Sequence, residues 1–238
     1  MAAPQQFVAH LAEHQYHPRS NKHGVALCDY VLEDLLANCP KIAADAAARK
    51  LVYERNRVIT VGSNDWNIDL ILGPLPSGFQ PPATTDPIVR AVPSTIRIAI
   101  EAKTIMTEHG KARRNRQRDL DSFHQFARRY DVTTVTSALT VVNIATTFKS
   151  PLRQVLTVHK NIATLVQSTI GILRSIQLRS SLDQPGLDAN TVIIVEHDNV
   201  NATKTALVTS QPAPQTGDPL HHDSFLHRIC DCYSQRWA

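Results

Sequence analysis

Three charged residues in this sequence, Asp69, Glu101 and Lys103, are spaced so that they could hold a metal ion and activate water. Glu101 and Lys103 are two residues apart in a segment rich in isoleucine, which is typical of a strand. Side chains two residues apart in a strand project from the same face. If the strand that contains Asp69 is a neighbour, two carboxylates and one ammonium group converge.

The chemistry that such a group could perform is metal-assisted hydrolysis of a phosphate ester. Two carboxylates in close contact cannot both remain charged without a positive partner, and Mg²⁺ prefers hard oxygen ligands together with bound water. A cation there would stabilise charge on phosphate oxygens and acidify a bound water, while Lys103 would hold or polarise that water. We therefore expect Mg²⁺ as the cofactor, with Mn²⁺ able to substitute.

A cluster of positive charges follows these residues in the chain. Five cations fall within eight residues that contain no acidic residue: Lys111, Arg113, Arg114, Arg116 and Arg118. The formal net charge of the whole chain is only +4, so this local cluster is more informative than the total. Because the cations have few local partners, contact with the phosphates of a nucleic acid is favoured over a solvated helix face.

The segments that must position these residues alternate between two hydrophobic periods. Helical spacing is found in residues 25–38, 111–130, 151–178 and 223–237. Strand composition is found in residues 52–61, 68–72, 95–102, 133–147, 191–196 and 206–208, and the turn at 62–65 joins the first two as a hairpin. This order predicts an α/β (α+β) fold in which a central mixed β-sheet is flanked by α-helices.

The length of 238 residues is compatible with one domain, and we expect a single domain over 1–238. Six prolines between residues 74 and 93 predict a loop insertion without regular structure. No apolar run approaches the roughly 20 residues that cross a bilayer, and the N-terminus does not resemble a signal peptide. We therefore expect no membrane association and a cytoplasmic location.

Cysteine and histidine provide weaker signals. The spacing of the four cysteines, Cys28, Cys39, Cys230 and Cys232, does not match a zinc site, so we expect reduced thiols, with Cys28 buried as a small hydrophobic residue. The adjacent His221 and His222 are expected to be exposed to solvent in a loop.

The segments 68–71 and 98–103 together resemble the motif of the PD-(D/E)XK nuclease superfamily. The resemblance implies a restriction-endonuclease-like fold, with Asp69 and Glu101 as metal ligands and Lys103 as the catalytic lysine. Many members also carry an acidic residue on the first helix, and Glu33 matches that position as a further metal ligand. Asp65, and less well Asp86, are alternatives to Asp69, because 32 residues separate Asp69 from Glu101.

The same resemblance implies a Mg²⁺-dependent endonuclease that hydrolyses phosphodiester bonds of double-stranded DNA, in prokaryotic restriction or anti-phage defence. Cutting both strands needs two active sites, so a homodimer or higher homo-oligomer is expected. The run Val92, Pro93 and Ser94 before Glu101 is also similar to nucleases activated by a nucleotide second messenger, which keeps such an activator open. The alternatives are a non-catalytic DNA-binding or assembly module on the same fold, and a DNA repair or recombination nuclease.

Overall fold

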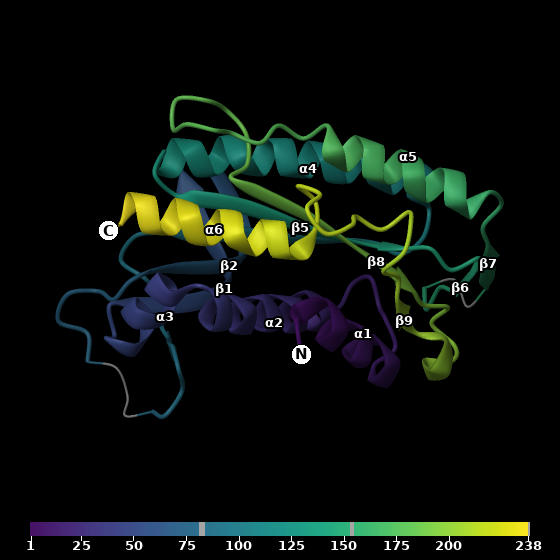
Figure 1. Cartoon of the computed structure of the whole chain (residues 1–238), viewed down its shortest axis with the longest axis horizontal. Helices are drawn as coiled ribbons and strands as arrows, with labels where there is room; N and C mark the ends of the chain where they lie inside the picture. Colours follow the sequence, from purple (N-terminus) through teal and green to yellow (C-terminus); the bar gives the residue numbers. More distant parts are fainter. Residues whose placement is uncertain (81–83, 153–154, 238) are drawn as a thin grey trace.

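A mixed β-sheet forms the centre of the protein, with helices on both faces (Figure 1). The computed structural model describes residues 1–80, 84–152 and 155–237. Within these residues the main sheet has seven strands in the order β3-β1-β2-β4-β5-β8-β9, and there are six α-helices. The predicted α/β architecture with a central mixed sheet is confirmed.

The strands of the main sheet are β1 (Leu51–Val61), β2 (Asn64–Pro74), β3 (Val89–Arg90), β4 (Ile98–Ile105), β5 (Val135–Asn143), β8 (Ala189–Glu196) and β9 (Ala206–Leu207). A second, two-stranded sheet consists of β6 (Thr147–Lys149) and β7 (Leu156–Val158). The helices are α1 (Ala3–Glu13), α2 (Lys22–Asn38), α3 (Pro40–Ala47), α4 (His109–Tyr130), α5 (Ile162–Arg174) and α6 (His222–Arg236), with a 3₁₀ turn η1 (Ala202–Lys204).

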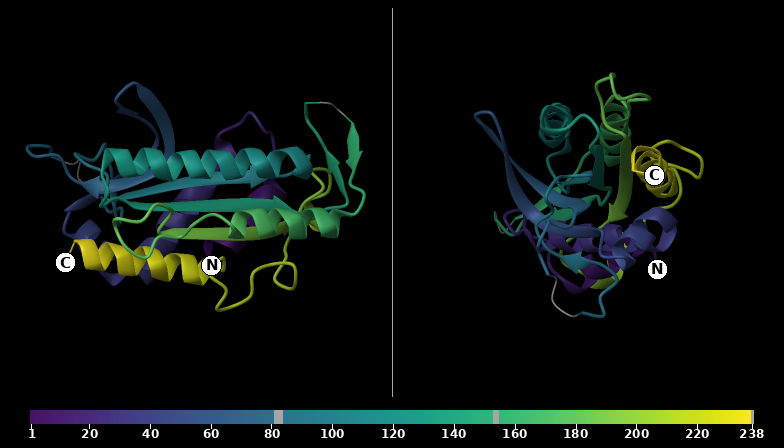
Figure 2. Two further views of the ribbon diagram at one scale, coloured as in Figure 1. Left: turned by 90° about the horizontal axis from the view of Figure 1, so that it is seen from above. Right: turned by 90° about the vertical axis from the view of Figure 1, so that its left-hand side faces the viewer.

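Antiparallel and parallel pairs both occur in the main sheet, and at its edges β3 runs parallel to β1 and β9 runs antiparallel to β8. β1, β2 and β4 are successive antiparallel neighbours, whereas β5 runs parallel to β4 and β8 runs parallel to β5. The two parallel connections contain α4 and α5, which cover one face of the sheet. The other face packs against α1, α2, α3 and α6, and Figure 2 shows α4 and α5 across the sheet from the N-terminal helices.

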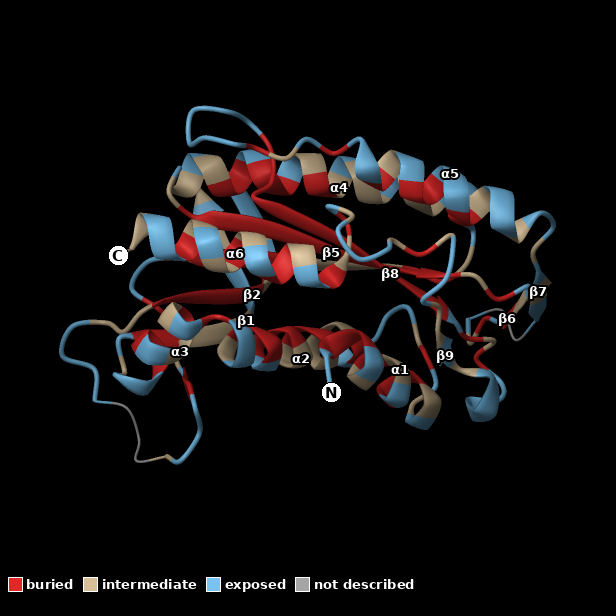
Figure 3. Cartoon of the chain, viewed as in Figure 1, coloured by how far each residue is buried: buried red, intermediate tan, exposed pale blue. Residues whose placement is uncertain are grey.

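The central strands are buried on both faces because helices cover both. Every residue of β5 is buried, as are all residues of β8 except its last, and Figure 3 shows these strands as continuously buried. The distal half of the hairpin of β1 and β2 is mostly half-buried or exposed, although Ile59, Val61 and Trp66 pack against the core beneath α4. A turn at residues 62–63 joins the antiparallel strands β1 and β2, so the hairpin predicted around residues 62–65 is confirmed.

Helix prediction from periodicity succeeded where helices are long and partly failed elsewhere. The helix expected over 151–178 is limited to α5, because residues 156–158 form strand β7 instead; residues 153 and 154 lie outside the described residues. α1 and α3 were not predicted. They are short helices whose apolar residues, such as Phe7 and Ile42, are fully buried, so packing rather than local propensity stabilises them.

Most of the predicted Pro-rich loop has no regular structure, although Val89–Arg90 forms β3 beside β1. Residues 81–83 of that loop lie outside the described residues. Within the described ranges, no helix has both the length and the apolar character that a membrane span requires.

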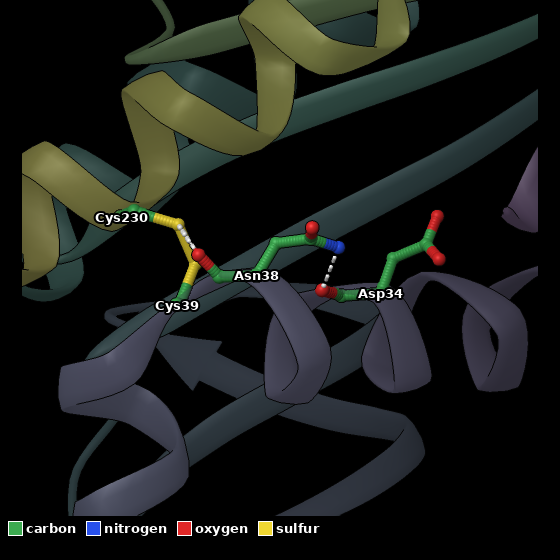
Figure 4. Close-up of a disulfide and its surroundings, with 4 residues drawn as sticks. All are labelled: Asp34, Asn38, Cys39 and Cys230. Atoms are coloured by element: carbon green, nitrogen blue, oxygen red, sulfur yellow. Dashed lines mark hydrogen bonds between the residues drawn. A yellow bond between two sulfur atoms is a disulfide. The ribbon is translucent and has the colours of Figure 1, made fainter.

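The expectation of four reduced cysteines was wrong for two of them. Cys39 and Cys230 form a disulfide with a Cα–Cα distance of 5.3 Å, whereas Cys28 is free and buried as predicted. Figure 4 shows the disulfide joining α6 to the junction of α2 and α3. The two cysteines are 191 residues apart in the sequence, so only the packing of α6 against α2 and α3 brings them together.

The expectation that both adjacent histidines are exposed was wrong, because His221 is half-buried and His222 is buried. Nε2 of His222 lies 2.7 Å from Oδ2 of the buried Asp34, which also accepts a hydrogen bond from the backbone N–H of Ala3. Asp34 therefore links the N-termini of α1 and α6 to α2. His221 instead caps α6, since its side chain accepts a hydrogen bond from the backbone N–H of Asp223.

Candidate active site

The candidate active site lies where β2 and β4 part. The ladder between them pairs Leu72 with Ile98 and Leu70 with Ile100, and it ends there. Continuing the same register would place Asp69 opposite Glu101. Instead of a further backbone pair, Oδ2 of Asp69 accepts a hydrogen bond of 2.8 Å from the backbone N–H of Ala102. The Asp69 carboxylate thus bridges the gap between the two strands.

The alternation of side chains along β2 breaks at Asp69. Ile68 and Ile71 both pack in the core beneath α4, although they are three residues apart, whereas Leu70 packs in the opposite core. On β1 the residue between the partners of Ile68 and Leu70 is Asn56, which has a left-handed backbone with φ of 50°. The hairpin therefore twists at this level, and its distal half turns toward α4.

Glu101 and Lys103 lie on the α4 face of β4, because Ile98 and Ile100 pack on the other face. The Glu101 side chain is only 2% exposed, and that of Lys103 is 20% exposed. The Lys103 ammonium donates a hydrogen bond to Oε1 of Glu101. The other oxygen of the same carboxylate, Oε2, is buried and has no hydrogen-bond partner among the described residues. A buried acceptor without a partner is energetically unfavourable. The lone pairs of this oxygen are therefore available to a proton or a cation.

Both carboxylates bind protons more tightly than usual. Burial raises the pKa of Asp69, against the opposing effects of Lys103 and of the hydrogen bond from Ala102. Burial raises the pKa of Glu101 to about 7, and the charge of Asp69 adds to that rise. The pairing with Lys103 compensates only in part. Near neutral pH this pair of carboxylates therefore takes up positive charge readily.

The donor set fits a hard divalent cation. The carboxylates of Asp69 and Glu101 provide oxygen ligands only, and one Glu101 oxygen has no hydrogen-bond partner among the described residues. In the described ranges of the chain, no three or more His, Cys, Asp or Glu side chains gather so that they could hold a metal. A zinc centre commonly needs three or four protein ligands. Mg²⁺ is commonly bound through one or two carboxylates and keeps several waters, so it fits Asp69 and Glu101 better.

Glu33 is not placed with this pair. It is exposed on α2, where it accepts a hydrogen bond from the amide of Gln6, and its charge is not among those that act on Asp69 or Glu101. Cys28 is the residue of α2 on which the charges of both carboxylates act. Its pKa is raised by burial first, and then by the charges of Asp69 and Glu101. The sequence did not identify Cys28 as a neighbour of the site, because the rotation of α2 over the sheet is a tertiary property.

The two alternatives to Asp69 lie elsewhere. Asp65 is exposed near the tip of the hairpin, where its Oδ1 accepts a hydrogen bond of 2.7 Å from the Thr60 hydroxyl. At about 3.3 Å per residue, it is roughly 13 Å along β2 from Asp69. Asp86 is exposed in the Pro-rich loop, where its backbone oxygen binds Arg49. Of the three aspartates, only Asp69 is a charge that acts on Glu101.

Trp66 is a further neighbour of the site that the sequence did not reveal. The Trp66 side chain lies close enough to Glu101 to counteract, in part, the rise in the pKa of that carboxyl. The Trp66 ring also lies 6.1 Å from the ring of Phe123 on α4. Strict alternation would place Trp66 and Asp69 on opposite faces of β2, so only the twist at Asp69 brings Trp66 toward Glu101.

The five predicted cations follow β4 on α4, and the structure divides them into two groups. Arg113 donates to the Ser168 hydroxyl at 2.6 Å and Arg116 pairs with Asp119 at 2.7 Å. The other three are exposed and make no side-chain hydrogen bond or ion pair with the described residues: Lys111, Arg114 and Arg118. These three, called the α4 stripe below, are three and four residues apart and therefore share one helix face.

Comparison of the chain with models of protein families, with curated proteins and with solved structures found no match.

Proposed function

We propose that this protein is a metal-dependent endonuclease that hydrolyses phosphodiester bonds of double-stranded DNA. One observation carries the proposal: Asp69 faces the position of Glu101 where β2 and β4 part, and Lys103 binds the same Glu101 carboxylate. Two carboxylates and one ammonium group, placed where two strands part, are the groups that metal-assisted phosphate hydrolysis requires.

The connectivity around this opening supports the resemblance to the PD-(D/E)XK superfamily. Helix α2 precedes the antiparallel strands β1, β2 and β4, helix α4 follows, and β5 returns parallel to β4. The resemblance implies a restriction-endonuclease-like core with the Asp on the second strand and the Glu and Lys on the third. Asp69 lies on β2, the second of these three antiparallel strands, and Glu101 and Lys103 lie on β4, the third.

The roles follow from the geometry. Asp69 and Glu101 would hold Mg²⁺, or Mn²⁺ in its place, which when bound neutralises phosphate charge and acidifies a water. Asp69 is kept in position by Ala102, and Glu101 by Lys103. Lys103 retains partial access to solvent, so its ammonium can hold a water or neutralise charge that develops on a phosphate oxygen.

The α4 stripe supports DNA as the substrate. Its three cations have no carboxylate partner among the described residues, and they begin six residues after the C-terminal end of β4. Along α4 they span about 10 Å at 1.5 Å per residue, so one phosphate backbone could contact all three. Since the described residues of each chain form one such site, cutting both strands implies a homodimer or a larger homo-oligomer.

The resemblance further suggests a prokaryotic restriction or anti-phage nuclease that acts in the cytoplasm. This role is tested by the products from defined linear DNA in the presence of Mg²⁺. Discrete fragments would indicate recognition of a sequence, and a smear would indicate cutting without sequence preference. Intact DNA that is nevertheless bound would contradict the proposal and leave a binding module on the same fold.

A further inference from the structure

A second concentration of positive charge lines a hollow at the other end of the sheet. This hollow of about 690 Å³, called the α3–α6 pocket below, lies between the end of α3, the start of β4 and the end of α6. Its walls carry five cations, Lys41, Arg49, Lys50, Arg97 and Arg236, and one carboxylate, Asp45. The formal net charge of the whole chain is only +4, so this pocket is far more basic than the surface on average.

Among the residues that the structure describes, only two of the five cations are neutralised by carboxylates. Lys41 pairs with Asp45 at 3.0 Å, and Arg236 pairs with the buried Asp188, which is not part of the pocket wall. The other three are Arg49, Lys50 and Arg97, which have no carboxylate within ion-pair distance among the described residues.

Among the described residues the hydrogen-bond partners of these three cations are neutral or absent, although the charge of Asp45 also acts on Arg97. Arg49 donates to the backbone oxygens of Thr84 and Asp86, at 2.9 and 3.1 Å. Arg97 donates to the Tyr233 hydroxyl at 3.2 Å and lies over the Trp237 ring. The ammonium of Lys50 is exposed and makes no hydrogen bond or ion pair with the described residues. Like charges that converge on one hollow repel each other unless an anion enters it.

The backbone of Arg49 is a second, independent sign that the cation matters. Arg49 follows α3 with a φ of 56°, the left-handed conformation in which helices usually end with glycine. A residue with a Cβ is strained there relative to glycine. The chain nevertheless places an arginine at this position and directs it to the pocket wall.

The α3–α6 pocket is separate from the candidate active site. Arg97 precedes β4, and Lys103 is six residues further along, or about 20 Å at 3.3 Å per residue. The helices that border the pocket cover the face of the sheet opposite α4, so the α4 stripe is not part of it. A ligand bound here would not occupy the carboxylate pair.

We propose that the α3–α6 pocket binds a small anion that carries two or more phosphate groups. The guanidinium groups of Arg49 and Arg97 suit bidentate contact with phosphate, and Lys50 adds a mobile point charge. The volume is within the range of small-molecule sites. The same cations could contact the phosphates of a nucleic acid, but a concave pocket away from the α4 stripe favours a free ligand. This proposal does not depend on nuclease activity.

The test uses inorganic tripolyphosphate, which does not absorb where tryptophan emits. The chain has two tryptophans, so the Trp66→Phe protein reports on Trp237 alone. Saturable heat in titration calorimetry, together with a matching change in Trp237 emission, is expected. Lys50→Gln and Arg49→Gln should each weaken binding about tenfold or more, since each removes a charge-assisted contact. Lys50→Gln breaks no contact in the described residues, so it should not affect folding.

Arg114→Gln is the matched control, because it removes one cation from the α4 stripe by the same substitution. It should leave tripolyphosphate binding unchanged but weaken the binding of a short DNA duplex. Lys50→Gln and Arg49→Gln should weaken tripolyphosphate binding but leave the binding of the duplex unchanged. Absence of heat and of an emission change would overturn the proposal, as would an equal loss in Arg114→Gln. Loss of duplex affinity in Lys50→Gln would assign the pocket to nucleic acid instead of a free ligand.

Discussion

Oδ2 of Asp69 accepts a hydrogen bond of 2.8 Å from the backbone N–H of Ala102, the residue between Glu101 and Lys103. This contact fixes the Asp69 carboxylate against the strand that carries the other two groups, and a hydrogen bond of this kind favours the charged form. Oδ1 of Asp69 accepts no hydrogen bond from the described residues. Asp69 and Glu101 therefore each present one oxygen that the described residues leave without a hydrogen bond.

Removal of any one of the three central side chains should abolish cleavage. For Asp69→Ala, Glu101→Ala and Lys103→Ala we expect rates at least about 10³-fold lower, because each removes a ligand or a charge needed in the transition state. Duplex affinity and the circular dichroism spectrum should be largely unchanged. Asp65→Ala, at the exposed end of the same strand, is the matched control and should cut normally; an inactive Asp65→Ala with an active Asp69→Ala would reverse the assignment.

The raised pKa of Glu101 predicts an unusual dependence of stability on pH. Burial raises this pKa from 4.5 to about 7, so the folded, metal-free protein binds the proton more tightly than the unfolded chain does. The contribution of Glu101 to stability is therefore lost as pH rises from about 4.5 to about 7. Glu101→Gln, which carries no charge to bury, should be more stable than wild type at about pH 8, by roughly 1–3 kcal/mol.

Urea unfolding of both proteins with a chelator present measures this difference, and it should shrink toward about pH 5. The control is Glu33→Gln, at an exposed position on α2, for which no comparable gain at high pH is expected. A Glu101→Gln variant that is less stable than wild type at every pH would mean that the ion pair with Lys103 outweighs the burial of the carboxylate.

The α4 stripe should contribute to DNA affinity without regard to sequence. Arg114→Ala combined with Arg118→Ala should weaken binding to all duplexes alike, because phosphate contacts do not read bases. The slope of the logarithm of affinity against the logarithm of salt should fall by up to about two units, at about 0.9 per contact. Fluorescence anisotropy over a range of salt concentrations measures both effects.

The matched control for this experiment is Arg113→Ala combined with Arg116→Ala, also on α4. These two guanidinium groups already bind Ser168 and Asp119, so their loss should change the salt slope less. Equal slopes for both double variants would show that the exposed face of α4 has no special role. An altered preference for sequence would place these arginines in a groove of the duplex.

The disulfide between Cys39 and Cys230 should stabilise the fold. It closes a loop with a sequence separation of 191 residues, so breaking it frees the unfolded chain considerably. Cys39→Ser combined with Cys230→Ser should lower the free energy of unfolding by about 2–4 kcal/mol. Cys232→Ser, which removes a free cysteine from the same helix, is the control in the same denaturation experiment. Equal stability of all three proteins would show that the bond contributes nothing.

Local pattern was sufficient to predict the longer strands of the main sheet and the placement of Glu101 and Lys103 on one face, but it did not predict β3 or β7. Alternation along a strand is a property of the backbone itself, and the isoleucines around Glu101 indicate a central strand without reference to the rest of the chain. The α4 helix could be predicted for the same reason, since its apolar residues recur at helical spacing. The choice of Asp69 over Asp65 required the register of β2 against β4, which sequence spacing does not determine.

Other features depend on how distant elements pack. Glu33 and Cys28 are on the same helix, and only the rotation of α2 over the sheet places Cys28 near the carboxylates and Glu33 outside. The partners in the disulfide likewise meet only because α6 docks on α2 and α3. The position of Trp66 depends on a twist in the hairpin at Asp69. None of these relationships leaves a periodic signal in the sequence.

The most direct test of the central claim is cleavage of supercoiled plasmid DNA by wild-type protein and by Lys103→Ala, with Mg²⁺, Mn²⁺ or Ca²⁺ or with excess chelator. The wild type should give nicked and linear plasmid with Mg²⁺ or Mn²⁺. It should bind without cutting in Ca²⁺, which activates water poorly, and it should be inactive in chelator. Lys103→Ala should bind the plasmid but leave it supercoiled. Cutting that persists in excess chelator, or that is unchanged in Lys103→Ala, would contradict the assignment of Asp69, Glu101 and Lys103 as a metal-dependent nuclease site.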